Sequence, residues 1–275
     1  MSANEKKTVW AACFSPTGTT RKIVNALADQ IAKTLDRERK TFDFTLPGTR
    51  TDSPSFSPND LVVLGVPVYA GRVPNLMGSY LRSLAGGGAL AVPIVLYGNR
   101  AYEDSLIELR DILEEDGFCT IAGGAFIGEH SFSYILGAER PDSADMEIAA
   151  KFGAEICGKL RKGTQEHPVS VPGCAPYRNY HQPTDQQGNR LVFLKDKPKT
   201  NEECNHCGLC VKLCPLGSID KDDPSLVSGP CMKCGACVKG CPKKAKYYDS
   251  VPFLRHKQDL EELYTNPRKE PEYFL

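Results

Sequence analysis

The chain has 275 residues, of which 41% are hydrophobic, and its 34 basic and 34 acidic side chains give a formal net charge of +0. Residues 1–165 carry 18 Lys or Arg and 20 Asp or Glu, and the remainder carries 16 and 14, so the two halves are not oppositely charged. This balance argues against nucleic acid or an anionic membrane as a partner. No apolar stretch approaches the ~20 residues needed to span a bilayer.

The first part of the chain alternates predicted strands with predicted helices. The strands are apolar runs bounded by turn residues: Lys7–Phe14, Lys40–Phe44, Asp60–Val66, Val92–Tyr97 and Phe118–Ile127. The helices carry apolar residues at helical spacing: Arg21–Leu35, a segment near Pro74–Leu84, Glu103–Glu115 and Ser143–Leu160. Five strands, each followed by a crossover, predict a doubly wound parallel α/β sheet. Ligands of such sheets bind outside the carboxyl ends of the strands.

The later part of the chain differs in composition. Residues 161–200 are polar and rich in proline, which predicts an extended connector rather than a flexible tether. Val251–Tyr264 carries one short helical pattern, and a charged tail follows. We therefore expect four parts: a first domain of residues 1–163, a connector of 164–199, a cysteine-rich domain of 200–249, and a C-terminal helix and tail of 250–275.

The loop between the first strand and the first helix reads Ser15-Pro16-Thr17-Gly18-Thr19-Thr20. Hydroxyls, a glycine and the free amides of a helix start can surround a phosphate without any cation. An ordinary helix N-cap is the alternative, but four hydroxyls and a glycine exceed what a cap needs. The sequence contains neither a nucleoside-triphosphate loop nor a dinucleotide fingerprint. The loop therefore indicates a binding site for a terminal phosphate.

Eight of the 12 cysteines form one pattern that occurs twice with identical spacing. Two such runs, each ending in Cys-Pro, are typical of bacterial two-cluster ferredoxins, in which the fourth cysteine of each run binds the cluster of the other run. The expected ligands are Cys204, Cys207, Cys210 and Cys241 for one [4Fe–4S] cluster, and Cys231, Cys234, Cys237 and Cys214 for the second.

Structural zinc and disulfide bonds are the alternatives for these cysteines. Zinc sites usually pair two Cys-x2-Cys halves and need neither a third such step nor a Cys-Pro ending. Disulfides need an oxidising compartment, whereas Met1–Lys7 is polar and Val9–Phe14 is too short for the apolar part of a signal peptide. We therefore favour iron–sulfur clusters and expect a cytoplasmic protein.

The chain resembles the flavodoxin–ferredoxin fusion family of anaerobic bacteria. The resemblance rests on the double cysteine run, on the phosphate loop and on three further blocks: Pro67-Val68-Tyr69-Ala70-Gly71-Arg72-Val73-Pro74, Tyr97-Gly98-Asn99-Arg100-Ala101-Tyr102 and Gly128-Glu129-His130-Ser131-Phe132-Ser133. It implies a flavodoxin-like five-stranded sheet of order 2-1-3-4-5, a ferredoxin-like two-cluster domain, and FMN bound by the loops after strands one, three and four.

The cofactor-binding residues expected from this resemblance lie in those loops and just after the fifth strand. They are Ser15, Pro16, Thr17, Gly18, Thr19, Thr20, Pro67, Val68, Tyr69, Ala70, Gly71, Arg72, Tyr97, Gly98, Asn99, Arg100, Tyr102 and His130.

Several of these residues have an alternative interpretation from the sequence. Tyr69 and Tyr97 suit contact with a flavin ring, but an aromatic residue at a strand end also fills cores. Arg72 and Arg100 would favour the negative charge of a reduced flavin, or they are solvated surface side chains. A single histidine such as His130 is more often structural than catalytic.

Two functions are compatible with these features, and the catalytic residues stay unassigned. The favoured one is an electron-transfer iron–sulfur flavoprotein that passes electrons between two [4Fe–4S] clusters and FMN and on to a redox partner protein, such as a ferredoxin or a reductase. The alternative is an FMN-dependent reductase of a small molecule, fed by its own ferredoxin domain. A small-molecule acceptor and a homodimer stay open, and we expect neither a nucleic-acid partner nor a membrane span.

Overall fold

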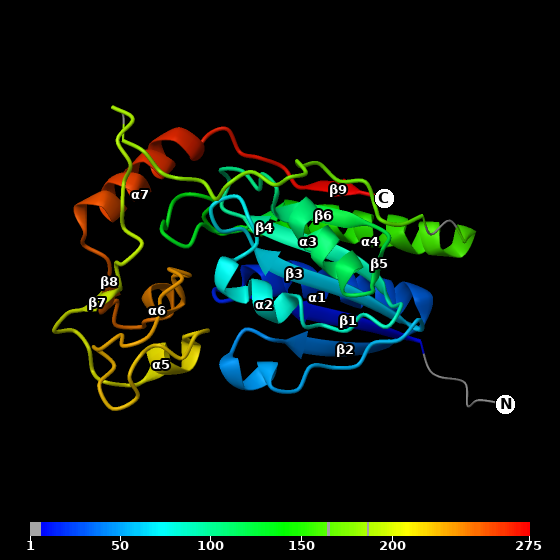
Figure 1. Ribbon diagram of the computed structural model, residues 1–275, viewed down its shortest axis with the longest axis horizontal. Coiled ribbons are helices and arrows are strands. Elements are labelled where there is room, and N and C mark those ends of the chain that lie inside the picture. Colours follow the sequence, from blue (N-terminus) through cyan, green and yellow to red (C-terminus); the bar gives the residue numbers. More distant parts are fainter. Residues whose placement is uncertain (1–6, 164–165, 186) are drawn as a thin grey trace.

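The computed structural model describes residues 7–163, 166–185 and 187–275. Residues 1–6, on which the expected absence of a signal peptide partly rests, lie outside this range. A central sheet carries helices on both faces, and a smaller module lies beside one end of its strands (Figure 1). Within the described residues, no helix is both long and apolar enough to cross a membrane.

The sheet is parallel from its first edge through its centre, in the order β2-β1-β3-β4, with β5 and β6 both beside β4. Its strands are β1 (Thr8–Cys13), β2 (Glu38–Asp43), β3 (Asp60–Pro67), β4 (Leu90–Tyr97), β5 (Cys119–Thr120) and β6 (Gly123–Ile127). With β5 and β6 counted as one interrupted strand, the order is the flavodoxin-like 2-1-3-4-5. The predicted fold class is therefore confirmed.

The far edge of the sheet holds a strand that the sequence did not predict. The end of the charged tail forms β9 (Glu272–Phe274), which pairs antiparallel with β6. The ring of Tyr273 stacks on Phe152 at a centroid distance of 4.6 Å. The last residues of the chain therefore belong structurally to the first domain, and they cover an edge that would otherwise expose unpaired backbone groups.

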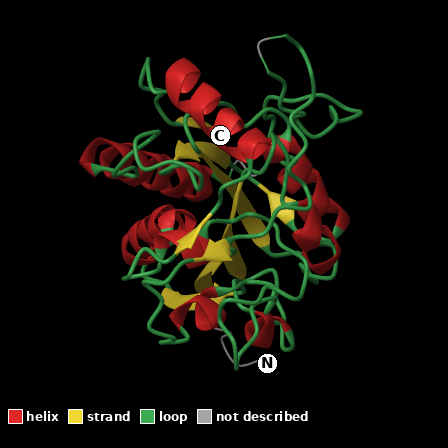
Figure 2. Ribbon diagram, turned by 90° about the vertical axis from the view of Figure 1, so that its left-hand side faces the viewer, coloured by secondary structure: helices red, strands yellow, loops and turns green. Residues whose placement is uncertain are grey.

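Helices lie on both faces of the sheet (Figure 2). An apolar layer packs on each face. Successive residues of β1 point to opposite sides: Val9, Ala11 and Cys13 pack with α1 (Thr19–Leu35) and α4 (Ser143–Lys162). Ala12 packs on the other side, with α3 (Ser105–Glu115). Because both faces are covered, the central strands are apolar throughout, as expected for parallel sheets.

The helix expected near Pro74–Leu84 is the least accurate of the predicted elements. The structure has only a 3₁₀ turn (Asn75–Met77) and one helical turn, α2 (Gly78–Leu81). Glycine loses more backbone freedom in a helix than any other residue, and Gly78 stands in the middle of the predicted segment. Met77 and Leu81 are nevertheless buried, so the segment still covers this face of the sheet.

The connector lies on the first domain as an extended segment. Arg178 binds the carboxylate of Asp104 at the start of α3, with 2.5 Å between Nη2 and Oδ1. The hydroxyl of Tyr177 donates to Asp111 at 2.7 Å, and the N–H of His181 donates to the carbonyl of Ala70 at 2.8 Å. The connector is therefore held by specific polar contacts along α3 and the loop after β3.

The cysteine-rich domain is small and has little regular structure. Its elements are β7 (Lys199–Thr200), α5 (Leu209–Leu213), α6 (Ala236–Lys239) and β8 (Lys246–Tyr247), and β7 pairs antiparallel with β8. The longer α7 (Val251–Tyr264) follows, at the bounds that the sequence predicted. In Figure 1 this domain lies beyond the carboxyl ends of the parallel strands, where an α/β sheet binds its ligands.

Candidate functional site

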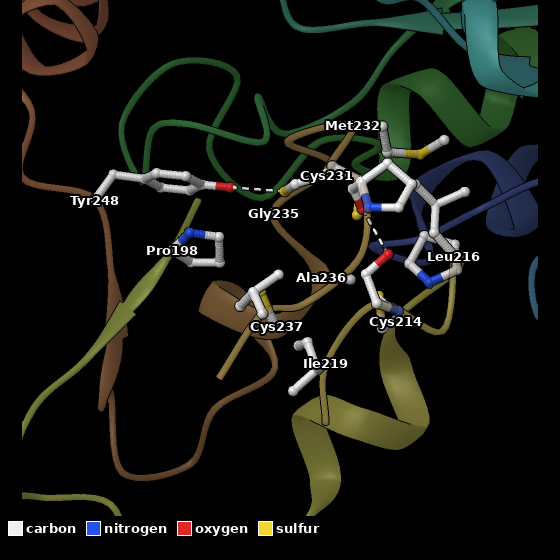
Figure 3. A pocket seen from close by; sticks show the side chains of 15 residues that line it. Pro198, Cys214, Leu216, Ile219, Cys231, Met232, Gly235, Ala236, Cys237 and Tyr248 are labelled. Atoms are coloured by element: carbon white, nitrogen blue, oxygen red, sulfur yellow. Dashed lines mark hydrogen bonds between the residues drawn. The ribbon is translucent and has the colours of Figure 1, made fainter. Parts of the chain in front are cut away.

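One cavity of the cysteine-rich domain is surrounded by thiols from both cysteine runs. Cys231, Cys234 and Cys237 of the second run line it together with Cys214, the last cysteine of the first run. Cys214 directly follows α5, and its side chain lies across the cavity from Cys231 and Cys237 (Figure 3). The hydroxyl of Tyr248 lies 3.7 Å from the sulfur of Cys231.

The remaining four cysteines of the two runs line a second cavity. Cys204, Cys207 and Cys210 of the first run meet Cys241, the last cysteine of the second run. The thiols are therefore grouped as crossed ligation requires, although the ligation itself stays a prediction. In the part of the chain that the structure describes, no three His, Cys, Asp or Glu side chains are close enough to share a single metal ion.

The two cysteine runs follow the same backbone path. Gly208 and Gly235 both have left-handed backbone angles, with φ of 69° and 75°, and each begins a short helix. The N–H of Ser218 donates to the sulfur of Cys214, and the N–H of Ala245 donates to the sulfur of Cys241, both at 3.3 Å. Such bonds favour a thiolate, the form in which cysteine binds iron.

The pKa values of the thiols reflect these surroundings. Burial raises the pKa of Cys237 to about 12 and raises that of Cys234 as well. Burial also acts against ionisation of Cys241, but the N–H groups of residues 243–246 outweigh it and lower the pKa of this thiol. Because a buried thiolate needs a positive partner, the deep thiols suit a cationic iron core in their centre.

The predicted phosphate loop forms one wall of a third cavity, of about 480 Å³. Ser15, Pro16, Thr17 and Gly18 line it at the start of α1. The loop is fixed from within, because the N–H of Ser15 donates to the hydroxyl of Thr45 at 2.8 Å and the hydroxyl of Ser15 accepts from the N–H of Arg21 at 3.0 Å. Gly18 has a φ of 88°, which favours glycine at this turn.

The opposite wall of this cavity comes from the cysteine-rich domain. Leu213 of α5 and Ala236 and Lys239 of α6 face the phosphate loop across the cavity. Ala236 also lines the cavity that contains Cys214 and Cys231. Ala236 therefore borders both a thiol-lined cavity and the cavity at the phosphate loop. No sequence motif links Ala236 to the phosphate loop.

Charged side chains stand on both walls of the cavity at the phosphate loop. Arg21 pairs with Asp43 at 3.0 Å, and both line the cavity. Lys239 binds the carboxylate of Glu129 and donates to the carbonyl of Ser133 at 2.5 Å. Burial lowers the pKa of Lys239 even though the ion pair with Glu129 opposes this. No sequence motif assigns Arg21, Asp43 or Lys239 to this site.

Two predicted residues of the phosphate loop do not line this cavity. Thr20 is buried, and its methyl group packs against Gly65 of β3, whose missing side chain leaves room for it. Thr19 lies beside Gly128, where a β-carbon would come within 3.0 Å of its side chain. Both threonines therefore help to seat the start of α1 on the sheet.

The predicted loop after β3 contacts the connector through Arg72 and Ala70. The Nε and Nη2 atoms of Arg72 donate to both carboxylate oxygens of Glu108, at 2.7 and 2.8 Å. Its guanidinium also lies over the rings of Tyr177 and Tyr180, at 4.8 and 5.1 Å. Arg72 is therefore not a solvated surface side chain, and its contact with a cofactor stays a prediction.

Tyr69, in the same loop, lies near the thiols of Cys231 and Cys234. Burial raises its pKa well above the ordinary value, and the nearby thiols of Cys234 and Cys231 act in the same direction. The loop after β3 therefore approaches one of the thiol-lined cavities rather than the cavity at the phosphate loop. The other predicted residues of this loop, Pro67, Val68, Ala70 and Gly71, do not line the latter cavity either.

The predicted loop after β4 is covered by the segment that follows α7. The side-chain amide of Asn99 donates to the carbonyl of Tyr264 at 2.6 Å and accepts from the N–H of Lys269 at 3.0 Å. Arg100 pairs with Glu103 at 2.7 Å. Tyr97 is buried beside Tyr102, at a centroid distance of 5.4 Å, so core packing is the interpretation that the structure favours for it.

His130 lies between this loop and the C-terminal helix. Its ring fits against Gly98, where a β-carbon would come 2.3 Å from the imidazole. Its Nδ1 accepts from the N–H of Phe132 at 3.1 Å. Burial, helped by the nearby His256, lowers the pKa of His130 to about 3, so the imidazole is neutral at pH 7. A role in binding a cofactor stays a prediction for this residue.

The comparison with protein families identifies the cysteine-rich domain. Residues 201–217 and 228–248 match a family described as a 4Fe-4S binding domain. All eight cysteines of the two runs fall within the matched residues. We refer to this part of the chain as the 4Fe-4S domain. No curated protein matches the chain.

Solved structures that resemble the chain include three flavodoxins. One from the domain Archaea is 12% identical over 56% of this chain and 99% of its own, with a TM-score of 0.39. One from Streptococcus pneumonia is 16% identical over 55% and 99%, with a TM-score of 0.39. A variant from Fusobacterium nucleatum, bound to flavin mononucleotide, is 17% identical over 58% and 99%, with a TM-score of 0.38. The fold assignment rests on the strand order of this chain, not on these scores.

Proposed function

We propose that this protein is an electron-transfer iron–sulfur flavoprotein, in which two [4Fe–4S] clusters exchange electrons with one FMN. The observation that carries the proposal is the position of Ala236, which lines both a cavity with four thiols and the cavity at the phosphate loop. When bound, the clusters would exchange single electrons and FMN would accept or release one or two.

The residues around the two thiol-lined cavities fit iron–sulfur clusters. Each cavity offers four thiols, in the grouping that the double-run motif requires. In each cavity, one cysteine sulfur accepts a backbone N–H bond at 3.3 Å, a contact that stabilises a thiolate. Cys204, Cys207, Cys210 and Cys241 would hold one cluster, and Cys214, Cys231, Cys234 and Cys237 the other.

The cavity at the phosphate loop fits FMN in size, and a helix start forms part of its wall. Its volume of about 480 Å³ lies within the range of about 300–1,000 Å³ that is usual for small-molecule sites. The first turn of α1 offers backbone amides and the positive end of its dipole to a phosphate. Two cationic side chains stand on its walls, Arg21 paired with Asp43 and Lys239 paired with Glu129. The hydroxyl of Thr17 completes the expected phosphate contacts.

The exposure of the thiols indicates which cluster site a redox partner protein would approach. Cys207 is exposed, whereas Cys234 and Cys237 are buried. A partner protein would therefore approach the cavity that contains Cys207, and the buried thiols would face the FMN side. The proposal also implies a reducing compartment such as the cytoplasm, because the thiols must stay unoxidised to bind iron.

Anaerobic reconstitution tests the cofactor content of this proposal. The full chain is loaded with iron, sulfide and FMN, separated from the excess, and analysed for each component. We expect about eight iron ions, about eight sulfide ions and one flavin per chain. A content of about four iron ions, or loss of the flavin on desalting, would contradict the proposal.

A further inference from the structure

A fourth cavity, of about 320 Å³, lies outside the proposed cofactor sites. It is lined by four parts of the chain: the loop at Phe132, Val238 of α6, the strand β8 with the residues just before and after it, and the first half of α7. The proposed electron transfer between the clusters and FMN assigns no role to it.

The walls of this cavity are mostly aromatic and firmly packed. Tyr248 stacks on Phe253 at a centroid distance of 4.3 Å, and Phe132 packs on Phe253 at 4.8 Å. Phe253 is buried, so this side of the cavity is a fixed apolar surface. Tyr134 and Leu254 also line the cavity but remain largely exposed, which leaves it open to solvent. Such walls suit a flat apolar molecule.

The charge of the lining is entirely positive. Lys244, Lys246 and Lys257 line the cavity, and no Asp or Glu is among its described lining residues. Lys246 is buried and donates to the carbonyl of Pro224, so its position is fixed. Lys257 has a loose ion pair with Glu261, at 3.6 Å. Lys244 is exposed, and its ammonium group is free to turn towards a ligand.

The cavity also adjoins both thiol-lined cavities. Tyr248 lines this cavity and the one that contains Cys231, and its hydroxyl lies 3.7 Å from the sulfur of that cysteine. Lys246 lines this cavity and the one that contains Cys241. A molecule bound here would therefore contact side chains that border both proposed cluster sites.

We propose that this cavity is a binding site for a small anion with a flat, apolar body, such as an aromatic carboxylate. The aromatic walls hold the apolar body, and Lys244 and Lys257 bind the acidic group at the open side. The site is distinct from the cavity at the phosphate loop, and no lining residue is common to the two. Binding here therefore does not depend on the assignment of FMN.

Calorimetric titration of the reconstituted, FMN-loaded protein tests the proposal. The probe is 2-naphthoate, and the uncharged 2-naphthalenemethanol serves as its neutral counterpart. We expect one saturable site for the anion, with affinity that falls as salt rises. The neutral molecule should bind at least about tenfold more weakly, as the loss of one charge-assisted hydrogen bond implies. Equal binding of both probes, or no saturable binding of the anion, would overturn the proposal.

Substitutions locate the binding. Lys244→Gln and Lys257→Gln should each weaken 2-naphthoate by about tenfold and leave the neutral probe unchanged. Leu254→Trp should block the cavity for both probes without removing a charge. Lys243→Gln is the matched control, because Lys243 is exposed, lies next to Lys244 and does not line the cavity. If Lys243→Gln weakens the anion as much as the other two lysine variants, or if Leu254→Trp has no effect, the assigned site is wrong.

Discussion

Gly235 lies directly against Ser131: a β-carbon built on this glycine would come 2.6 Å from the carbonyl oxygen of Ser131. Gly235 belongs to the 4Fe-4S domain, between two predicted cluster ligands, and Ser131 belongs to the first domain. The two domains therefore meet backbone to backbone beside the cavity that contains Cys234. A side chain at this position would push them apart at the place where electrons are proposed to cross.

The first prediction concerns this contact. Gly208 occupies the equivalent position in the first cysteine run, with a similar φ, but a β-carbon there would meet nothing within 4 Å. Gly208→Ala should therefore cost only the strain of a left-handed backbone, about 1–2 kcal/mol. Gly235→Ala has the same strain and the clash with Ser131 in addition, so it should lower the melting temperature of the loaded protein further. Equal losses in both variants would show that the contact with Ser131 does not constrain the domains.

The second prediction concerns the crossed grouping of the thiols. Cys214→Ser should damage the cluster held with Cys231, Cys234 and Cys237, because the serine oxygen is a poorer ligand for iron than a thiolate. The iron content should fall, and electron paramagnetic resonance of the reduced protein should lose one of two cluster signals. Cys174→Ser is the control, since this exposed cysteine lies outside both runs. Loss of the cluster at Cys204 instead would show that the ligand sets are reversed.

The third prediction concerns the phosphate loop. Thr17→Ala should weaken FMN by about 1.5–3 kcal/mol, because a hydrogen bond to a charged phosphate is removed. Fluorescence titration of the flavin-free protein measures the affinity. Thr49→Ala is a control outside the phosphate loop in the lining of the same cavity, where the hydroxyl already donates to the carbonyl of Leu46 at 2.8 Å. Unchanged affinity in Thr17→Ala would argue against phosphate binding at this loop.

The fourth prediction concerns Arg72. Its contact with the flavin stays a prediction, and its guanidinium pairs with Glu108 at 2.7 Å. Arg72→Ala should destabilise the protein by about 3–5 kcal/mol, since it leaves the buried carboxylate of Glu108 unpaired. Arg82→Ala removes an exposed ion pair with Glu115 on the same helix and should cost at most about 1 kcal/mol. Denaturant unfolding gives both values, and a similar small loss in each would contradict the structural role of Arg72.

Much of the fold follows from local features of the sequence. Leu61–Val66 is an apolar run of six residues that suits a strand covered on both faces, and it forms most of β3. The end of the chain shows the limit of such reasoning. The residues of β9 are few and partly charged, and their partner β6 lies far away in the sequence, so no local pattern indicates their pairing.

The candidate site was predictable only where its residues are close together in the sequence. The cysteine spacing and the hydroxyl-rich loop at Ser15 are recognisable as local motifs. Their residues line the cavities described above. The loop at Asn99 was assigned to the flavin by resemblance, but the segment after α7 occupies it through contacts between distant residues. The same reason explains why Ala236 and Lys239 were not expected at the phosphate loop.

Electron transfer within one chain, across the cavities that share Ala236, is tested most directly by rapid mixing of the loaded protein with a one-electron donor. Cluster and flavin absorbance are followed together at several protein concentrations, with the donor in excess. We predict that the clusters are reduced first and that the flavin follows at a rate independent of protein concentration. A flavin rate that rises linearly with protein concentration would contradict transfer within the chain.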